Sequence, residues 1–191
     1  MRTLKLTKET IQNILTDLLK RSPNNYTQYE SSVNEIIANV RTNGDTAIFN
    51  YTKKFDGATV TPENIEVTEA EIAEAYEQVD PKLLEVIRKA KENIRVYHEK
   101  QKQYSWFDSS IPGTMLGQKV TPIAKAGVYV PGGKAVYPSS VLMNIMPAKV
   151  AGVEEIIMTT PCNKEGKVNP STLVAAKEAG SSCRCKRGRR R

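Results

Sequence analysis

The chain has 191 residues, of which 39% are hydrophobic, and this is enough for a core in one large domain or two small ones. Its apolar runs are much shorter than the roughly 20 residues of a membrane-spanning helix, and the first ten residues form no apolar signal segment, so we expect a cytoplasmic protein without membrane contact. Six of the seven excess positive charges lie within residues 184–191, so the remainder is close to neutral. The composition therefore does not indicate a basic domain that binds nucleic acid.

Residues 1–103 are predicted to form a mainly helical N-terminal region. Apolar side chains recur at helical spacing over residues 8–20 and again over residues 29–40. The second run ends at Asn43-Gly44, a turn signal, and Asp45 can cap the helix that follows. We therefore expect two helices to meet at the glycine.

The second half of this region contains two helix-start signals. Residues 65–68 are β-prone and predict a short strand, and Thr68 with Glu71 has the spacing of a capping box. Asp80-Pro81 then starts a helix of about twenty residues, because Asp suits the cap and Pro suits the first helical position. Its apolar stripe consists of Leu83, Leu84, Ile87, Ala90, Ile94 and Tyr97.

Residues 104–180 are predicted to form an α/β domain. The expected elements are strands at 115–120 and 126–130, a helix at 139–151, a strand at 155–159 and a helix at 170–179. Asn169 is expected to cap the last helix and Gly180 to end it. Pro147 is expected to kink or split the first of these helices. The alternation predicts an α/β fold in which the helical N-terminal region precedes an incomplete Rossmann-like parallel βαβα unit.

Residues 181–191, SSCRCKRGRRR, form a divergent basic tail. The tail begins where the next strand is due, so we expect the unit to end on a helix with no further strand to pair. One hypothesis is an out-of-frame or truncation scar, which the coding DNA would test. The other is a solvated arm that binds nucleic-acid phosphates.

A glycine-rich loop follows the strand at 126–130, in the segment Gly127-Val-Tyr-Val-Pro-Gly-Gly-Lys134. Parallel α/β sheets place ligand loops at this position, and glycine lets backbone N–H groups approach a ligand closely. Ala135 and Val128 break the Walker pattern, and the GxGxxG pattern is also missing. The residues alone therefore leave a ligand loop and a structural turn both open.

The segment AGVYVPGGKAVYPSSVLMNIMPAKVAGVEEIIMTTP, residues 126–161, closely resembles the signature region of histidinol dehydrogenases. EGKVNPSTLVAAKEAG at 165–180 fits the same family, as do the shorter segments Asn43-Gly-Asp and Phe55-Asp-Gly57. The resemblance covers roughly residues 10–180. It implies a homodimeric, zinc-containing enzyme of histidine biosynthesis that oxidises L-histidinol to L-histidine with NAD.

In that family the tyrosine of the YVPGG motif contacts NAD, so the resemblance implies Tyr129 as a cofactor-binding residue, with Pro131, Gly132 and Gly133 shaping the same loop. A core aromatic at a strand end is the alternative interpretation of Tyr129. The family's zinc ligands and its Glu-His pair lie in the later part of a chain more than twice this size. We therefore assign no catalytic or metal residue and expect an N-terminal fragment that is inactive alone.

Other reactive side chains favour structural roles. His98 is the single histidine, lies on a charged helix and cannot supply two zinc ligands and a base. Cys162 follows a strand and has no histidine partner in sequence, and Cys183 and Cys185 are too close together for the usual metal pair. The alternative functions are an inactive α/β binding module with a nucleic-acid-binding arginine tail, or a chain that only associates with a complementing C-terminal half.

Overall fold

The computed structural model describes residues 7, 10, 11, 27–132 and 136–186. The expected helix over residues 8–20 lies largely outside these residues, as do Gly133 and the end of the basic tail. Contacts divide the chain into residues 1–47 and 48–191, which are described separately. No helix in the described ranges has the length and apolar character to cross a membrane.

Helix α2, Thr27–Asp56, is broken at Gly44, whose φ of 56° and ψ of −134° are not helical. This is the position where the Asn43-Gly44 signal predicted that two helices meet. Gly57, directly after the helix, has a φ of 70°, a conformation that glycine adopts without a Cβ penalty. Both breaks therefore follow from local sequence.

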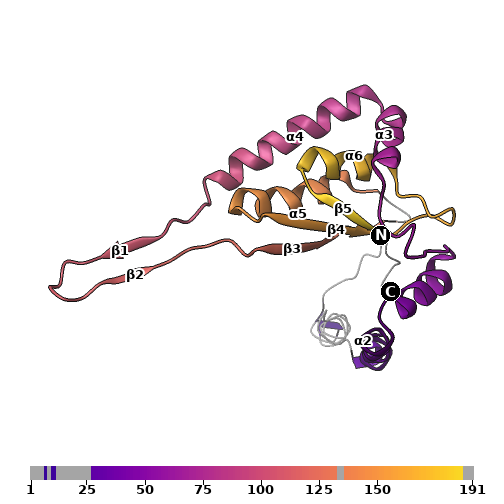
Figure 1. Ribbon diagram of the computed structural model, residues 1–191, viewed down its shortest axis with the longest axis horizontal. Coiled ribbons are helices and arrows are strands. Elements are labelled where there is room, and N and C mark those ends of the chain that lie inside the picture. Colours follow the sequence, from indigo (N-terminus) through magenta and orange to yellow (C-terminus); the bar gives the residue numbers. More distant parts are fainter. Residues whose placement is uncertain (1–6, 8–9, 12–26, 133–135, 187–191) are drawn as a thin grey trace. The chain divides into compact units, whose positions relative to one another are not determined.

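A three-stranded parallel sheet forms the centre of the second unit. Its strands are β3 (Lys125–Tyr129), β4 (Glu155–Thr160) and β5 (Ser182–Lys186), in the order β3-β4-β5. The crossover helices α5 (Pro138–Ala151) and α6 (Pro170–Ala179) lie on one face of the sheet (Figure 1). Right-handed crossovers between strands in sequential order pass over the same face, which explains this arrangement.

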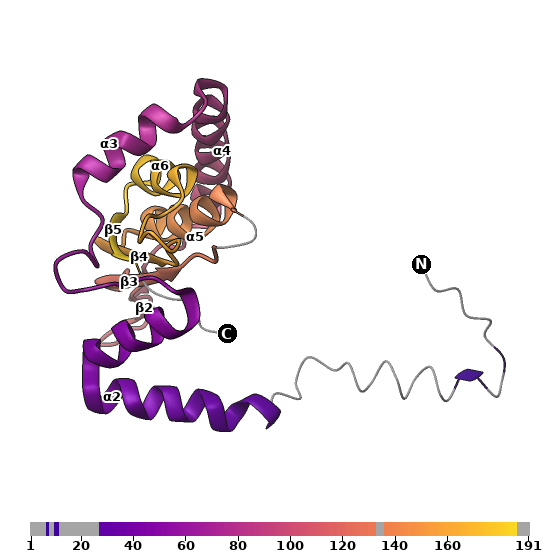
Figure 2. The same cartoon turned by 90° about the vertical axis from the view of Figure 1, so that its right-hand side faces the viewer.

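Two further helices, α3 (Glu69–Gln78) and α4 (Pro81–Glu99), form an outer layer over the crossover helices (Figure 2). Helix α4 packs against α5 and α6, and α3 packs against α6. Ile156 and Met158 of β4 are buried beneath these helices, as are Leu142, Ile145 and Leu173. The core therefore lies between the sheet and two layers of helix.

The helix caps follow the predictions from sequence. Thr68 and Glu71 form the capping box, with Thr68 Oγ1 accepting from Glu71 N at 3.2 Å and Thr68 N donating to Glu71 Oε2 at 2.9 Å. Asp80 Oδ1 accepts from Lys82 N at 2.7 Å, which caps α4. Asn169 caps α6 in the same way, and Gly180 ends that helix in the left-handed conformation.

The predicted α/β class is confirmed, with three differences in detail. Strand β5 pairs with β4 in parallel, so part of the basic tail continues the sheet and the expectation of no further strand is wrong. Residues 65–68 form no strand and lead into the α3 cap instead. Helix α5 is continuous from Pro138 to Ala151 with Pro147 inside it, so of the expected kink or split, the split is wrong.

An antiparallel ribbon, β1 (Trp106–Asp108) and β2 (Leu116–Gln118), joins α4 to the sheet. The strand expected at 115–120 is β2, and its partner β1 had no strand prediction. All residues of both strands are exposed. Figure 1 shows the ribbon projecting from the α/β layers.

Candidate cofactor site

The glycine-rich loop leaves the sheet at its carboxyl edge, where β3 ends at Tyr129 and β4 ends at Thr160. Val130 N donates to Thr159 O at 2.9 Å, which extends the pairing one residue past β3. A Cβ atom on Gly132 would lie 3.2 Å from Pro161 Cγ. Glycine at this position thus lets the loop pass close to the segment that follows β4.

Tyr129 is 48% exposed at the end of β3. Val128 packs against the core and Val130 is buried, so the alternation of a strand directs Tyr129 to the opposite face of the sheet. Pro131 is exposed and Gly132 is half-buried. The tyrosine ring is therefore available to a ligand at the carboxyl edge, where parallel sheets bind their ligands.

A cavity of about 290 Å³ opens beside this loop. Its lining comes from three places: Gly132 and Val136 near the loop, residues from the end of β4 to the first turn of α6, and the α3 side chains Glu71, Glu74, Ala75 and Gln78. Tyr129 and Pro131 do not line it. Of the predicted site residues that the structure describes, Gly132 alone belongs both to the loop and to the cavity.

Sequence reasoning missed the contributions of α3 and α6 to this cavity. Thr160 and Thr172 line it, and both are buried, at 2% and 5% exposure. The position of Thr160 at the end of a predicted strand was a usable signal. No pattern in the sequence indicated that α3, some eighty residues earlier, would close the cavity.

A charged pair joins α3 to the segment that follows β4. Lys167 Nζ lies 2.8 Å from Glu74 Oε1, and Gln78 Nε2 donates to the same oxygen at 2.8 Å. The hydrogen bond with Lys167 lowers the pKa of the Glu74 carboxyl. The same hydrogen bond with Glu74 raises the pKa of Lys167. Both side chains are about half exposed, so the pair adds little stability. It keeps Glu74 and Lys167 in their charged forms beside the cavity.

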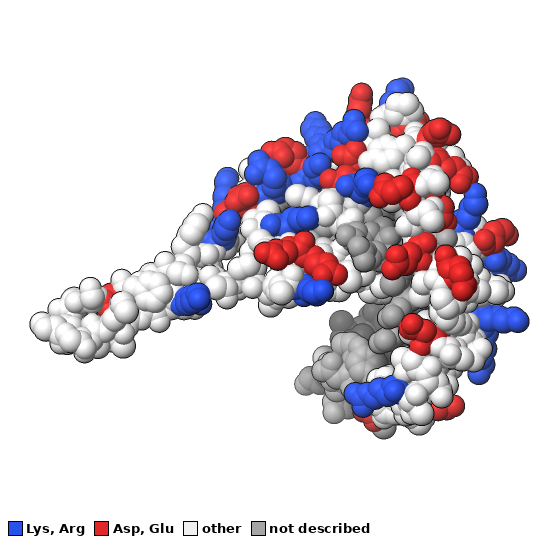
Figure 3. All heavy atoms as spheres, viewed as in Figure 1, with Lys and Arg blue, Asp and Glu red and all other residues white. Residues whose placement is uncertain are grey.

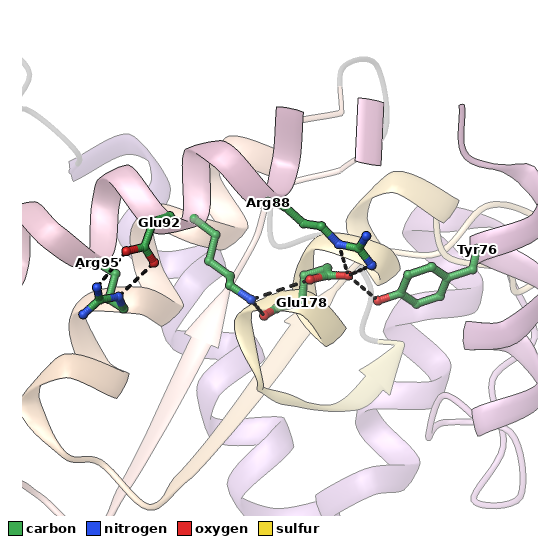
Figure 4. A network of polar contacts seen from close by, with 6 residues as sticks. Tyr76, Arg88, Glu92, Arg95 and Glu178 are labelled. Atoms are coloured by element: carbon green, nitrogen blue, oxygen red, sulfur yellow. Dashed lines mark hydrogen bonds and ion pairs between the residues drawn. The ribbon is translucent and has the colours of Figure 1, made fainter. Parts of the chain in front are cut away.

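A second network fastens α3 and α4 to α6 around Glu178, whose side chain is 11% exposed (Figure 4). Glu178 Oε1 accepts from Tyr76 Oη at 3.1 Å and from Arg88 Nε and Nη2 at 3.0 and 2.9 Å. Lys91 Nζ donates to the Glu178 backbone carbonyl at 2.9 Å. The network holds α3, which lines one side of the cavity, against α4 and α6.

The pKa values in this network follow from burial and charge. Burial acts to raise the pKa of Glu178, but hydrogen bonds from Arg88 and Tyr76 and the nearby cations outweigh it and lower the pKa. Burial, followed by the charge of Glu178, raises the pKa of Tyr76. Glu178 is therefore an ionised acceptor at neutral pH, with Tyr76 as a donor.

The other two reactive side chains lie in different places, His98 near the end of α4 and Cys162 beside the cavity. His98 is half-buried near the end of α4, and its Nδ1 lies 2.7 Å from Gln101 Oε1. Cys162 is half-buried and lines the cavity. Within the described ranges, no group of three or more His, Cys, Asp or Glu residues could hold a metal ion. The zinc donors of the family pattern therefore find no fit among the described residues.

Surface charge on the face shown in Figure 3 is mixed, with acidic and basic side chains interspersed over the helices. Arg88, Arg95 and Lys91 are balanced by Glu178, Glu92 and Glu99. Arg184 and Lys186 belong to β5 rather than to a separate arm. This face offers no extended basic surface of the kind that binds a phosphate backbone.

Comparison with known proteins identifies the family. The family model described as histidinol dehydrogenase matches residues 19–188, which include β5. The chain is 56% identical over 148 residues to the histidinol dehydrogenase of Heliobacterium mobile, covering 78% of this chain and 35% of that protein. It is 54% identical over 163 residues to the enzyme of Bacillus subtilis (strain 168), covering 85% of this chain and 38% of that one.

The fold agrees with the same assignment. The crystal structure of histidinol dehydrogenase from Elizabethkingia anophelis matches with a TM-score of 0.78 and 34% identity, over 84% of this chain and 36% of that chain. The present chain thus spans between 35% and 41% of the curated relatives that it matches. On the sequence and structural matches together, the chain belongs to the histidinol dehydrogenase family.

Proposed function

We propose that this chain supplies cofactor-binding residues to an NAD-dependent oxidation of L-histidinol to L-histidine in histidine biosynthesis. The observation that carries the proposal is the loop at the carboxyl end of β3, where Tyr129 is 48% exposed and Gly132 passes close to Pro161. Tyr129, Pro131, Gly132 and Gly133 are the residues that we assign to NAD. When bound, NAD supplies the hydride acceptor for each of the two oxidation steps.

The chain's own residues orient the cofactor in this proposal. The exposed ring of Tyr129 offers an apolar face and a hydroxyl to the cofactor, and the backbone of Gly132 allows close approach beside it. The parallel pairing of β3 with β4 places Tyr129 opposite Thr159, so the loop starts beside the segment that follows β4. Positioning, rather than bond making, is the role of this part of the enzyme.

The zinc chemistry of the family requires donors beyond those that this chain provides. The chain contains one histidine, whereas the family pattern needs two as ligands and one as a base. We therefore propose that the 191-residue chain alone does not oxidise histidinol, and that the active enzyme is a cytoplasmic homodimer whose subunits also contain the zinc-binding part. A sustained rise in reduced nicotinamide absorbance with the chain, histidinol, NAD and zinc would contradict this.

NAD binding tests the assignment of the loop. We expect Tyr129→Ala to weaken the binding of NAD to the full chain about tenfold, measured by isothermal titration calorimetry, since a stacked ring contributes roughly 1 to 3 kcal/mol. Tyr104→Ala is the matched control, because Tyr104 is 73% exposed and lies near the ribbon. Equal NAD affinity in the Tyr129 variant and the wild-type chain would refute the assignment.

A further inference from the structure

A groove of about 450 Å³ lies where helix α4 ends and the β1–β2 ribbon begins (Figure 1). Its lining comes from residues between 98 and 105, from residues 120–122 after β2, and from the last turns of α5. Because β4 begins at Glu155, shortly after α5 ends, the groove lies at the amino edge of the sheet. The loop that follows Tyr129 lies at the carboxyl edge, so the groove is a separate site.

The walls of this groove are held in place by contacts within the chain. Ser105 closes the neck of the ribbon, because its Oγ accepts from Val120 N at 2.9 Å and donates to Val120 O at 3.3 Å. The His98 ring is held by Gln101, whose Oε1 lies 2.7 Å from His98 Nδ1. Helix α4 packs against α5 in the same part of the molecule. The groove is therefore formed before a ligand binds, which lowers the cost of ordering the site.

An unpaired ammonium group marks the charge of the groove. Its lining contains one lysine, Lys102, and no Asp or Glu. Among the described residues the Lys102 ammonium has no ion-pair partner, whereas Lys91, Lys125, Lys167 and Lys177 each bind a carboxylate. A ligand with a negative charge complements this lining, and a single unpaired ammonium favours a single negative charge.

The two helix ends beside the groove do not present unpaired carbonyl groups to an anion. Carbonyl groups at the carboxyl end of a helix carry a partial negative charge. At the end of α4, the carbonyls of residues 97–99 accept from the N–H groups of residues 100–102 at 3.0 to 3.3 Å. At the end of α5, the carbonyls of residues 148 and 149 accept from residues 153 and 152, both at 3.0 Å. Lys102 therefore determines the sign of the charge that the groove favours.

Much of the remaining lining is apolar and suits a flat ring. This part consists of Tyr104, Val120, Pro122, Pro147, Val150 and Ala151. A volume of about 450 Å³ falls within the range of about 300 to 1,000 Å³ of small-molecule sites. Burial of a ring against this surface removes apolar area from water, which is favourable.

We propose that this groove binds a small aromatic monocarboxylate, with the carboxylate at Lys102 and the ring against Pro122, Pro147 and Val150. The carboxylate balances the unpaired ammonium and the ring covers the apolar lining, so a molecule with both parts binds better than either part alone. No residue of the groove belongs to the loop of Tyr129. The inference therefore goes beyond the proposed NAD function and does not depend on it.

Titration of the full chain with phenylacetate, followed by amide NMR spectroscopy, tests the site. We expect saturable shifts at residues 101–105, 120–121 and 150–151, and binding that weakens as salt is added. Phenylacetamide keeps the ring without the charge and acetate keeps the charge without the ring, so each should bind more weakly. Binding that does not saturate, shifts centred on the loop of Tyr129, or equal affinity for phenylacetamide would overturn the inference.

Two variants separate the charge from the apolar lining. Lys102→Gln should weaken phenylacetate binding about threefold to fivefold, the equivalent of an exposed ion pair, and leave phenylacetamide binding unchanged. Lys102→Arg should restore binding. Lys100→Gln is the matched control, because Lys100 is exposed at the same helix end but does not line the groove. Ala151→Phe should weaken both ligands, because its ring fills the groove without changing the charge, and Ala151 is exposed, so the urea midpoint should stay unchanged.

The outcomes separate this inference from the proposed function. Equal losses of phenylacetate affinity in the Lys100 and Lys102 variants, or unchanged binding in Ala151→Phe, would overturn the groove assignment. If phenylacetate binds as expected while NAD does not bind, the groove assignment stands and the NAD function fails. If NAD binds through Tyr129 and phenylacetate does not bind, the NAD function stands and the groove assignment fails.

Discussion

Replacing Glu178 by Gln should destabilise the chain by about 2 kcal/mol at pH 7. The carboxylate is 11% exposed and accepts from Tyr76 and from two nitrogens of Arg88. Hydrogen bonds to a charged group contribute roughly 1.5 to 3 kcal/mol, and the amide of Gln keeps one acceptor. Because Arg88 is 56% exposed, water recovers part of the lost interaction, which keeps the effect below that of a fully buried pair.

The stability loss should depend on pH. The pKa of Glu178 is lower in the folded chain than its ordinary value of 4.5, so its ionised form stabilises the fold above that value. This contribution is lost as the pH falls from 4.5 through the lower folded pKa. The difference between the wild-type chain and Glu178→Gln should therefore be full at pH 7 and shrink below pH 4.5.

Urea unfolding followed by circular dichroism at pH 7 and near pH 3 measures both effects, and about 2 kcal/mol corresponds to roughly 4 to 8 °C in Tm for a chain of this size. Glu92→Gln is the matched control, because Glu92 pairs with Arg95 at 2.7 Å but is 55% exposed. Its expected cost is much smaller than that of Glu178→Gln, because an exposed ion pair contributes little to stability. Equal stabilities of the two variants, or a Glu178 effect that persists undiminished near pH 3, would refute the reasoning.

Three further substitutions test the fold. Ile145→Ala should cost about 2 to 5 kcal/mol, because Ile145 is fully buried, while Met143→Ala on the same helix, where the side chain is 55% exposed, should cost far less; similar urea midpoints would contradict the packing. Thr68→Ala should cost about 1 kcal/mol through loss of the capping box, and an unchanged midpoint would argue against the cap. Gly180→Ala should lower the thermal midpoint, because φ is 77° and a Cβ would lie 3.3 Å from Lys149 Cε; a raised midpoint would refute the strain.

Local sequence determined most of the elements of this protein and several of their ends. Thr68 with Glu71, Asp80 with Pro81, and Asn169 with Gly180 all mark helix ends that the structure has, because capping depends on side chains within a few residues of the backbone groups they satisfy. The family resemblance likewise depended on contiguous segments of sequence. The loop that follows Tyr129 was predicted from the residues of one such segment.

Strand β5 was missed for the opposite reason. Its sequence, Ser182–Lys186, contains two basic residues and lacks the alternation of apolar residues that predicts a strand. The backbone pairs with β4 in parallel, and hydrogen bonding to a neighbouring strand depends little on side-chain character. Residues 65–68 show the converse, because they are β-prone but pair with no strand among the described residues.

The cavity was decided by tertiary structure alone. Glu74 and Lys167 are far apart in the sequence, and they meet because α3 packs on α6. Glu178 collects Tyr76 and Arg88 from two other helices for the same reason. The sequence by itself determined the helices, the sheet class, the family and the loop of Tyr129, since these depend on local spacing. Only the packing of distant helices placed Thr160 and Thr172 beside the same cavity, because which faces meet depends on contacts that no local pattern encodes.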